Sequence, residues 1–391
     1  MNLSSRVYWI ACLILLITSN RVCNADTPNG LLWDISIEAT KIDITTKDIY
    51  DKEATLPMPV FIFRPRDNRR HPFAILNHGR PEKNLRFTVN PDQYISIACY
   101  LISKDFVVAF PIRIGYGPTA DRLDPEDTGE CISAKFEPMK TAVRGELTAV
   151  VAHMKTLPYV DATHWISIGG SAGGLASLIL SGQNPEGFTA GINFSGGVGG
   201  DGYEIPGNPC SETALRRFIQ STAHPTLNKT LWLYWKNDML WGQRLPKEWF
   251  AHWVDAGGNG TFLSFDPVGE DGHKGMMIDM AHWRPVVDAF LNEVGFSGSP
   301  SEQPVAGSAT TELADQNNPA LTPGQLEAYR NFAATPLPHA FSASESGGWA
   351  YSTGGNAVVN ALLKCLHHTK SNGTCRVYAA ENTPYQLPST Q

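Results

Sequence analysis

The sequence predicts an α/β protein with a mostly parallel β-sheet, and three observations support this prediction. Short apolar runs alternate with helix-like runs between residues 31 and 295. Several of these runs are continuously apolar, as in strands that are covered on both faces. Segment 31–63 has no helix-like run between its strands, so it should open the sheet as antiparallel hairpins.

Each predicted element has its own pattern. The strand candidates are rich in Val, Ile, Phe and Trp and span residues 60–63, 73–79, 106–113, 165–170, 188–195, 230–236 and 261–266. Helix candidates lie between or after them, at residues 91–104, 139–156, 172–183, 211–222, 245–256 and 281–294. Helices that join successive parallel strands on both faces give a doubly wound sheet.

Composition limits the classes of partner. The chain has 391 residues, 42% of them hydrophobic, which is enough for one large core and a smaller unit. The formal net charge is -7 and there is no cluster of Lys and Arg, so we expect neither nucleic acid nor an anionic membrane surface as a partner. The sequence leaves the oligomeric state open.

The first 25 residues have the features of a signal peptide. Arg6 precedes the apolar stretch 7–17, which is short for a membrane span, and small residues precede a cleavage site after Ala25. We expect cleavage there, a secreted or periplasmic mature chain, and no stable membrane insertion. An uncleaved anchor is the alternative.

Five cysteines remain in the mature chain, without the C-x-x-C spacing of zinc or thioredoxin-like sites. Cys365 ends an apolar helical stripe and Cys375 opens the next strand, so an oxidising compartment should join them. Cys131 and Cys210 lie in loops that should rise from the same sheet edge, and they are a second candidate pair; two separate thiols are the alternative. Cys99 is expected to be a buried free thiol.

Composition also divides the chain. Residues 26–296 carry the alternating pattern and form the predicted catalytic domain. Residues 297–324 are rich in Ser, Pro, Gly and Asn and are predicted to be a linker. Residues 325–391 are predicted to form a small C-terminal α+β module with a helix at 356–368.

The segment WISIGGSAGGLASLIL, residues 165–180, changes from strand to helix without a loop and places one serine at the turn. Its centre fits the pattern G-x-S-x-G, in which a sharp turn raises a serine nucleophile above the sheet edge. Gly169, Ala172 and Gly173 leave room for that turn. The following helix directs N–H groups at any oxyanion formed beside Ser171.

A nucleophilic serine needs a base and an acid that orients the base. Asp238 ends the strand candidate 230–236, and His273 lies in the Gly-rich loop after strand candidate 261–266. Both positions fall at the carboxyl edge of a parallel sheet, where ligand sites form. The expected triad is therefore Ser171, Asp238 and His273.

The oxyanion hole should use two backbone N–H groups, those of Ala172 and Arg80. His78, just before that loop, is expected to be structural. Tyr116 lies in a segment that either lines the substrate pocket or turns the chain. Trp241 is either a pocket wall or, more simply, part of the core.

The stretches FAILNHGRP, FVVAFPIRIGYGPT, LPYVDATHWISIGGSAGG, NFSGG and FDPVGEDGHK resemble the α/β-hydrolase fold across residues 58–295. Within that fold they resemble the secreted bacterial branch of the dienelactone-hydrolase family. The resemblance implies acyl or ester hydrolysis and matches Ser171, Asp238 and His273 to the triad. Cytosolic members of the family use a cysteine nucleophile. Because this chain has a serine instead, the resemblance does not identify the substrate.

We therefore expect a serine hydrolase that cleaves a small carboxylic ester through an acyl-enzyme, with no metal and no cofactor. A serine peptidase of the prolyl-oligopeptidase type is one alternative, although no propeller-like repeat precedes the catalytic region. A non-catalytic surface-binding protein that acts through its C-terminal module is the other.

Overall fold

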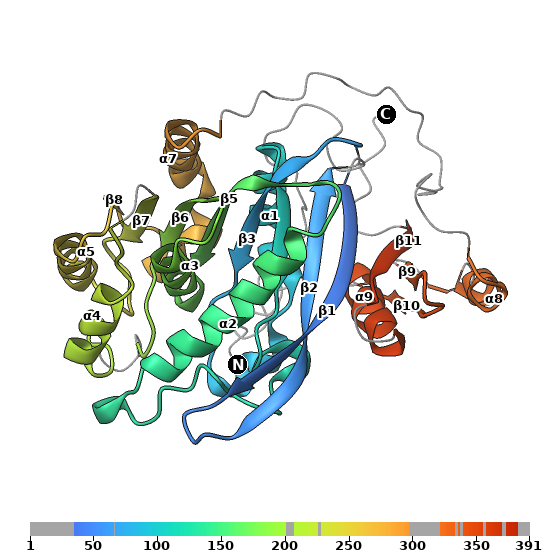
Figure 1. Ribbon diagram of the computed structural model, residues 1–391, viewed down its shortest axis with the longest axis horizontal. Coiled ribbons are helices and arrows are strands. Elements are labelled where there is room, and N and C mark those ends of the chain that lie inside the picture. The colour runs from blue at the N-terminus through green and yellow to red at the C-terminus, as the bar shows by residue number, and fades with distance from the viewer. Residues whose placement is uncertain are drawn as a thin grey trace, which may run out of the picture.

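The computed structural model describes residues 35–65, 67–200, 207–225, 228–296, 321–332, 335–336, 339–354, 357–369 and 373–381 (Figure 1). The predicted signal peptide and most of the predicted linker lie outside these residues. No helix in the described part is long and apolar enough to cross a membrane.

The described strands form a single mixed sheet in the order β10-β9-β11-β1-β2-β4-β3-β5-β6-β7-β8. Their bounds are β1 Ile35–Lys47, β2 Glu53–Pro65, β3 His71–Asn77, β4 Val107–Pro111, β5 Val160–Gly170, β6 Phe188–Phe194, β7 Lys229–Trp235, β8 Gly260–Phe265, β9 His339–Ser344, β10 Trp349–Thr353 and β11 Cys375–Glu381. The run from β4 to β8 is parallel throughout. Each predicted strand coincides with an observed one, and the α/β prediction is confirmed.

Helices cover both faces of this sheet (Figure 1). Their bounds are α1 Ile95–Ser103, α2 Glu137–Met154, α3 Ala172–Gln183, α4 Glu212–Gln220, α5 Leu245–Asp255, α6 Gly275–Ile278, α7 Met280–Glu293, α8 Pro323–Phe332 and α9 Ala357–His368. The buried side chains of α1, α7 and α9 belong to one core cluster, and those of α2 to α5 belong to the other. The sheet is therefore doubly wound, as predicted.

The alternation of side chains along β3 shows how one strand serves both cores. Phe73 and Ile75 belong to the α2–α5 cluster, whereas Ala74 and Leu76 belong to the α1, α7 and α9 cluster, and all four are fully buried. Successive side chains of a strand point to opposite faces. Burial on both faces explains why this strand reads as a continuous apolar run.

The described residues begin with the predicted antiparallel hairpin. β1 and β2 pair along their whole lengths, from Ile35 opposite Pro65 to Lys47 opposite Glu53. β2 then pairs antiparallel with β4 and so joins the hairpin to the parallel strands.

A buried histidine stands at the amino end of β3. His71 Nε2 lies 2.7 Å from Asp67 Oδ1, and its Nδ1 lies 3.1 Å from Asp105 Oδ1. Burial opposes the charged imidazole, but the hydrogen bonds to Asp105 and Asp67 outweigh it and raise the pKa of His71.

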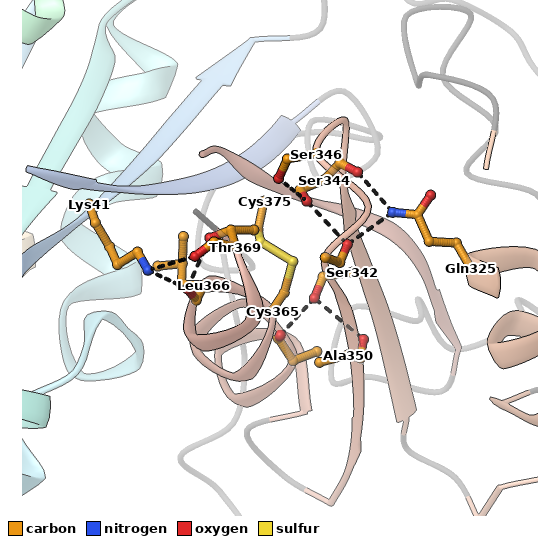
Figure 2. The surroundings of a disulfide bond; sticks show 12 residues. Lys41, Gln325, Ser342, Ser344, Ser346, Ala350, Cys365, Leu366, Thr369 and Cys375 are labelled. Atoms are coloured by element: carbon orange, nitrogen blue, oxygen red, sulfur yellow. Dashed lines mark hydrogen bonds between the residues drawn. A yellow bond between two sulfur atoms is a disulfide. The ribbon is translucent and has the colours of Figure 1, made fainter. Parts of the chain in front are cut away.

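The C-terminal strands extend the main sheet instead of forming a separate one. Glu38 of β1 lies opposite Arg376 of β11, and the two side chains form an ion pair at 2.9 Å. Lys41 Nζ of β1 donates to the carbonyls of Leu366 and Thr369, which end α9 (Figure 2). Side chains of α9 also share a core cluster with the main sheet.

This region departs from the expected boundaries in one detail. Helix α8 already begins at Pro323, inside the segment assigned to the linker, because Thr322 and Gln325 form reciprocal hydrogen bonds at its start. The division of the chain into a catalytic domain and an independently folding module stays a prediction.

Two disulfides join pairs of described cysteines. Cys365 and Cys375 are joined with their Cα atoms 6.1 Å apart, and Cys131 and Cys210 with theirs 4.7 Å apart. Cys99 is disulfide-bonded too, so its assignment as a free thiol is wrong. The apolar run around Cys99 indicated burial, and burial alone does not distinguish a thiol from a disulfide.

Candidate active site

Ser171 stands at the turn between β5 and α3. Its φ of 56° and ψ of -126° lie outside the regions that non-glycine residues usually adopt. The Ser171 N–H donates to Phe194 O at 2.9 Å, and its carbonyl accepts from the Gly197 N–H at 3.3 Å. These bonds to the end of β6 and to the loop after it hold the strained turn in place.

The small residues beside Ser171 are required by close backbone approach. A Cβ on Gly173 would lie 2.2 Å from Asn77 O, and a Cβ on Gly169 would lie 2.5 Å from Gly173 O. A Cβ at either position would therefore overlap main-chain atoms. The strand-turn-helix geometry expected for the G-x-S-x-G pattern is present.

His273 and Asp238 form a hydrogen-bonded pair. His273 Nδ1 lies 3.2 Å from Asp238 Oδ1 and 3.1 Å from Asp238 Oδ2. The Asp238 side chain is fully buried, and the His273 side chain is 13% exposed. Asp238 Oδ1 also accepts the N–H groups of Leu240 and Trp241, each at 3.0 Å, which fixes the carboxylate.

Trp241 links this pair to the Ser171 turn. Its ring meets the His273 ring edge to face, with the centroids 5.6 Å apart. Its Nε1 donates to Ser195 O at 2.7 Å, and its ring would touch a Cβ placed on Gly197, the residue bonded to Ser171 O. Trp241 is 1% exposed, which favours the core assignment over a pocket wall.

Two polar residues outside the predicted triad fasten the histidine loop. Asn237 donates through Nδ2 to Val268 O and Gly269 O and accepts the Val268 N–H. Asp271 Oδ1 accepts the N–H groups of His273 and Met239. In the sequence, Asn237 directly precedes Asp238, and Asp271 lies two residues before His273. Asn and Asp side chains often hydrogen-bond to nearby main chain, so their positions were the available signal.

The loop after β3 carries the expected oxyanion donor. The Arg80 guanidinium forms a two-pronged ion pair with Asp124, at 2.9 and 2.8 Å, so its side chain is directed into the protein. The Gly79 N–H is bonded to the Tyr94 hydroxyl at 2.8 Å. Among the described residues the Arg80 N–H has no acceptor. Ala172 begins α3, where the first N–H groups have no intrahelical acceptor.

Tyr116 lies under this loop and is fully buried. Its hydroxyl donates to Glu126 at 2.7 Å and accepts from Arg80 Nη1 at 3.0 Å. Glu126 is in turn ion-paired with the buried Arg113. Burial, followed by the nearby Glu126 carboxylate, raises the pKa of Tyr116 well above its usual range. This burial favours the alternative in which the segment turns the chain.

His78 is a structural residue, as expected. It is fully buried, its Nδ1 donates to Gly79 O at 2.8 Å, and its Nε2 accepts the Arg113 N–H at 3.1 Å. Burial and the nearby Arg113 guanidinium hold the pKa of His78 well below its usual value, so the ring is neutral.

The Cys131–Cys210 disulfide joins the loop after β4 to the loop after β6. Ser211 Oγ donates to Cys131 O at 2.6 Å, and the Cys210 N–H donates to Gly199 O. These bonds tie the disulfide to the glycine-rich segment that follows Ser195 and contacts Trp241. The two cysteines predicted to meet above this sheet edge are therefore joined.

No group of three or more His, Cys, Asp and Glu side chains in the described part of the chain is arranged to hold a metal ion.

Comparisons with known proteins complete the description. No family model and no curated protein matches the chain. Among solved structures, a Pyrococcus furiosus esterase is 13% identical, with a TM-score of 0.43 over 65% of this chain and 90% of that one. A Klebsiella pneumoniae protein described as a dienelactone hydrolase is 13% identical, with a TM-score of 0.44 over 66% of this chain and 98% of that one.

A longer protein, described as a dipeptidyl aminopeptidase IV from Bacteroides ovatus, is 15% identical, with a TM-score of 0.47 over 66% of this chain. The match spans only 36% of that protein. The strand order of the sheet, the antiparallel β2 and the serine turn between β5 and α3 are the arrangement of the α/β-hydrolase fold, and this chain has that fold.

Proposed function

We propose that this chain is a serine hydrolase that cleaves carboxylic esters through an acyl-enzyme. The observation that carries the proposal is that two features lie at the same edge of the sheet. Ser171 occupies a strained turn at the start of a helix, and His273 is bonded through Nδ1 to the buried Asp238. A strained serine and an oriented imidazole are the parts that nucleophilic acyl transfer requires.

We assign the part of each residue from its hydrogen bonds. His273 Nδ1 faces both Asp238 oxygens, so Nδ1 carries the hydrogen and Nε2 is the free base. Nε2 takes the hydroxyl proton as Ser171 Oγ attacks the ester carbonyl, and it then returns a proton to the leaving alcohol. Water, activated by the same Nε2, hydrolyses the acyl-enzyme and regenerates Ser171.

The negative charge of each tetrahedral intermediate would rest on backbone N–H groups. The Ala172 N–H stands at the start of α3, where the helix dipole is positive. The Arg80 N–H is the second donor, and the ion pair of its side chain with Asp124 limits the movement of this loop. Losing one such donor costs about 3–4 kcal/mol of transition-state stabilisation.

We also propose that the protein acts outside the cytosol. The two described disulfides fit a secreted or periplasmic protein, because the cytosol keeps thiols reduced. Edman sequencing of the secreted protein tests this location: a first residue at Asp26 would support the signal peptide, and an N-terminus at Met1 would contradict it.

The test compares p-nitrophenyl esters of increasing acyl length with the matching p-nitroanilide amides. Native protein should hydrolyse the esters and react with a fluorophosphonate probe. Ser171→Ala should fold, remain unlabelled and lose about 10⁴–10⁶ of kcat. Ser133→Ala, which changes an exposed serine, is the matched control and should be fully active.

Two further results would redirect the assignment. Asp238→Asn should lose less activity than His273→Ala, since the histidine transfers the proton and the aspartate orients it. Cleavage of the amides at rates near those of the esters would indicate a peptidase. Absence of both labelling and turnover in native protein would indicate a non-catalytic binding protein.

A further inference from the structure

Strand β10 is the outermost described strand at one end of the sheet, and no described strand pairs with its outer edge. Among the described strands only β9 pairs with it. The Ser344 N–H donates to Gly348 O at 2.8 Å, and bonded pairs of an antiparallel ladder recur at every second residue. Ala350 therefore bonds toward β9, and the N–H and C=O groups of Trp349 and Tyr351 point away from the sheet.

A cavity of about 610 Å³ follows this edge. It is lined by residues 346–351, which form the β9–β10 turn and the start of β10, and by Lys364 and His368 of α9. A ligand in this cavity would lie along the main chain of an edge strand, where the unpaired donors and acceptors are located.

The two sides of the cavity differ in chemistry. Lys364 and His368 stand one helical turn apart on α9, and within the described part of the chain neither forms an ion pair. Lys364 Nζ lies 3.3 Å from Ser352 Oγ. Trp349 and Tyr351 are 36% and 37% exposed, and their rings are within 8° of parallel. One side is therefore cationic and the other aromatic.

The walls of the cavity are fixed by buried contacts (Figure 2). Gln325 of α8 is 2% exposed, and its Nε2 donates to Ser344 O and Gly348 O at 2.8 and 2.9 Å, which holds the β9–β10 turn. The Cys365–Cys375 disulfide joins the last turn of α9 to β11. Because these walls are already ordered, a ligand would not have to order them on binding.

We propose that β10 binds an extended, acidic segment of a partner protein by strand addition. Such a segment would bond to the outward N–H and C=O groups of Trp349 and Tyr351. Alternate side chains would then face opposite sides, with carboxylates toward Lys364 and apolar groups toward the aromatic rings. The open main-chain edge favours a peptide over a saccharide, since a peptide offers donors and acceptors at the repeat of a strand.

The test uses the full chain and two end-capped peptides, one alternating valine with glutamate and the other valine with lysine. Calorimetric titration should show binding of the glutamate peptide and at least tenfold weaker binding of the lysine peptide. Hydrogen exchange of the Trp349 and Tyr351 amides should slow when the glutamate peptide is bound.

Matched variants separate the contributions of main chain and charge. Tyr351→Ala removes only the ring, whereas Tyr351→Pro removes the ring and the outward N–H, a change that edge strands tolerate. The proline variant should bind about tenfold more weakly than the alanine variant. Lys364→Glu should reverse the preference between the two peptides, while Lys364→Gln should reduce it.

Several results would overturn the proposal. These are equal affinity for the two peptides, no binding at all, or equal affinity of Tyr351→Pro and Tyr351→Ala. Binding of polygalacturonate alone, abolished by Trp349→Ala, would indicate an acidic saccharide site instead. If the proline variant melts early, the amide exchange of native protein and the Lys364 variants still decide the question.

Discussion

Replacing Gly173 by alanine tests how the nucleophile turn is built. A Cβ at this position would lie 2.2 Å from Asn77 O and 2.7 Å from both Asn77 C and His78 O. Ordinary contact begins near 3.4 Å, so β3 and the turn must separate by about 1.2 Å. The neighbouring atoms are main chain, so rotating a side chain cannot relieve the overlap.

The displaced atoms connect directly to the expected oxyanion donor, three residues beyond Asn77. Overpacking of a buried site costs about 1–3 kcal/mol, which for a chain of this size lowers Tm by about 1–4 °C. A misplacement of about 1 Å reduces catalysis by about 10²-fold. The loss should appear in kcat, because the Arg80 N–H acts mainly in the transition state.

Gly145→Ala is the matched control. A Cβ on Gly145 has nothing within 4 Å, and the residue lies on the exposed side of α2. That variant should gain about 0.5–1 kcal/mol of stability and keep its activity. Thermal unfolding and p-nitrophenyl ester kinetics measure both effects. A Gly173→Ala protein with Tm and kcat unchanged within error would refute the packing argument.

Three further changes test the rest of the structure. Cys365→Ser should lower the free energy of unfolding by about 3 kcal/mol, measured by urea titration, because it opens the loop closed by Cys375. The pKa of His71 is raised in the folded state, so the stability it contributes is complete below pH 6.5 and is lost as pH rises through the folded pKa. His71→Gln should therefore remove the fall in the free energy of unfolding above pH 6.5. Burial, and then the nearby Glu126 carboxylate, raises the pKa of Glu146 well above its usual value, so Glu146 lowers the free energy of unfolding by an amount that grows with pH. Glu146→Gln should therefore match or exceed the native free energy of unfolding in urea titrations at pH 8. A large loss of stability in this variant would contradict the argument.

The sequence predicted the features that depend on local pattern. The strand that ends at Asn77 is apolar throughout because both of its faces are buried, and that burial is visible in composition. The glycines on either side of Ser171 are required by main-chain contact, so they mark the turn in the sequence. Such signals place the elements and the candidate nucleophile to within a few residues.

The Cys131–Cys210 pair was named from the sequence, but other features that depend on distant contacts were not predicted. The pairing of Glu38 with Arg376 joins strands from opposite ends of the chain, and neither residue has a local signal for its partner. Tyr116 was equally compatible with a pocket and with a turn, because its burial depends on Glu126, later in the same loop, and on Arg80 from the loop after β3. Long-range polar contacts of this kind leave no periodicity in the sequence.

The joining of β11 to β1 has a consequence for the solubility of the protein. β1 is 13 residues long, and without β11 and α9 it would be the outer strand of the sheet, whereas β10, the present outer strand, has only 5 residues. A long open strand is a template for pairing with other molecules, and short ones reduce that hazard. A chain cut after Phe296 would therefore keep Ser171, Asp238 and His273 but should self-associate through β1, so we expect the C-terminal residues to limit aggregation of the protein.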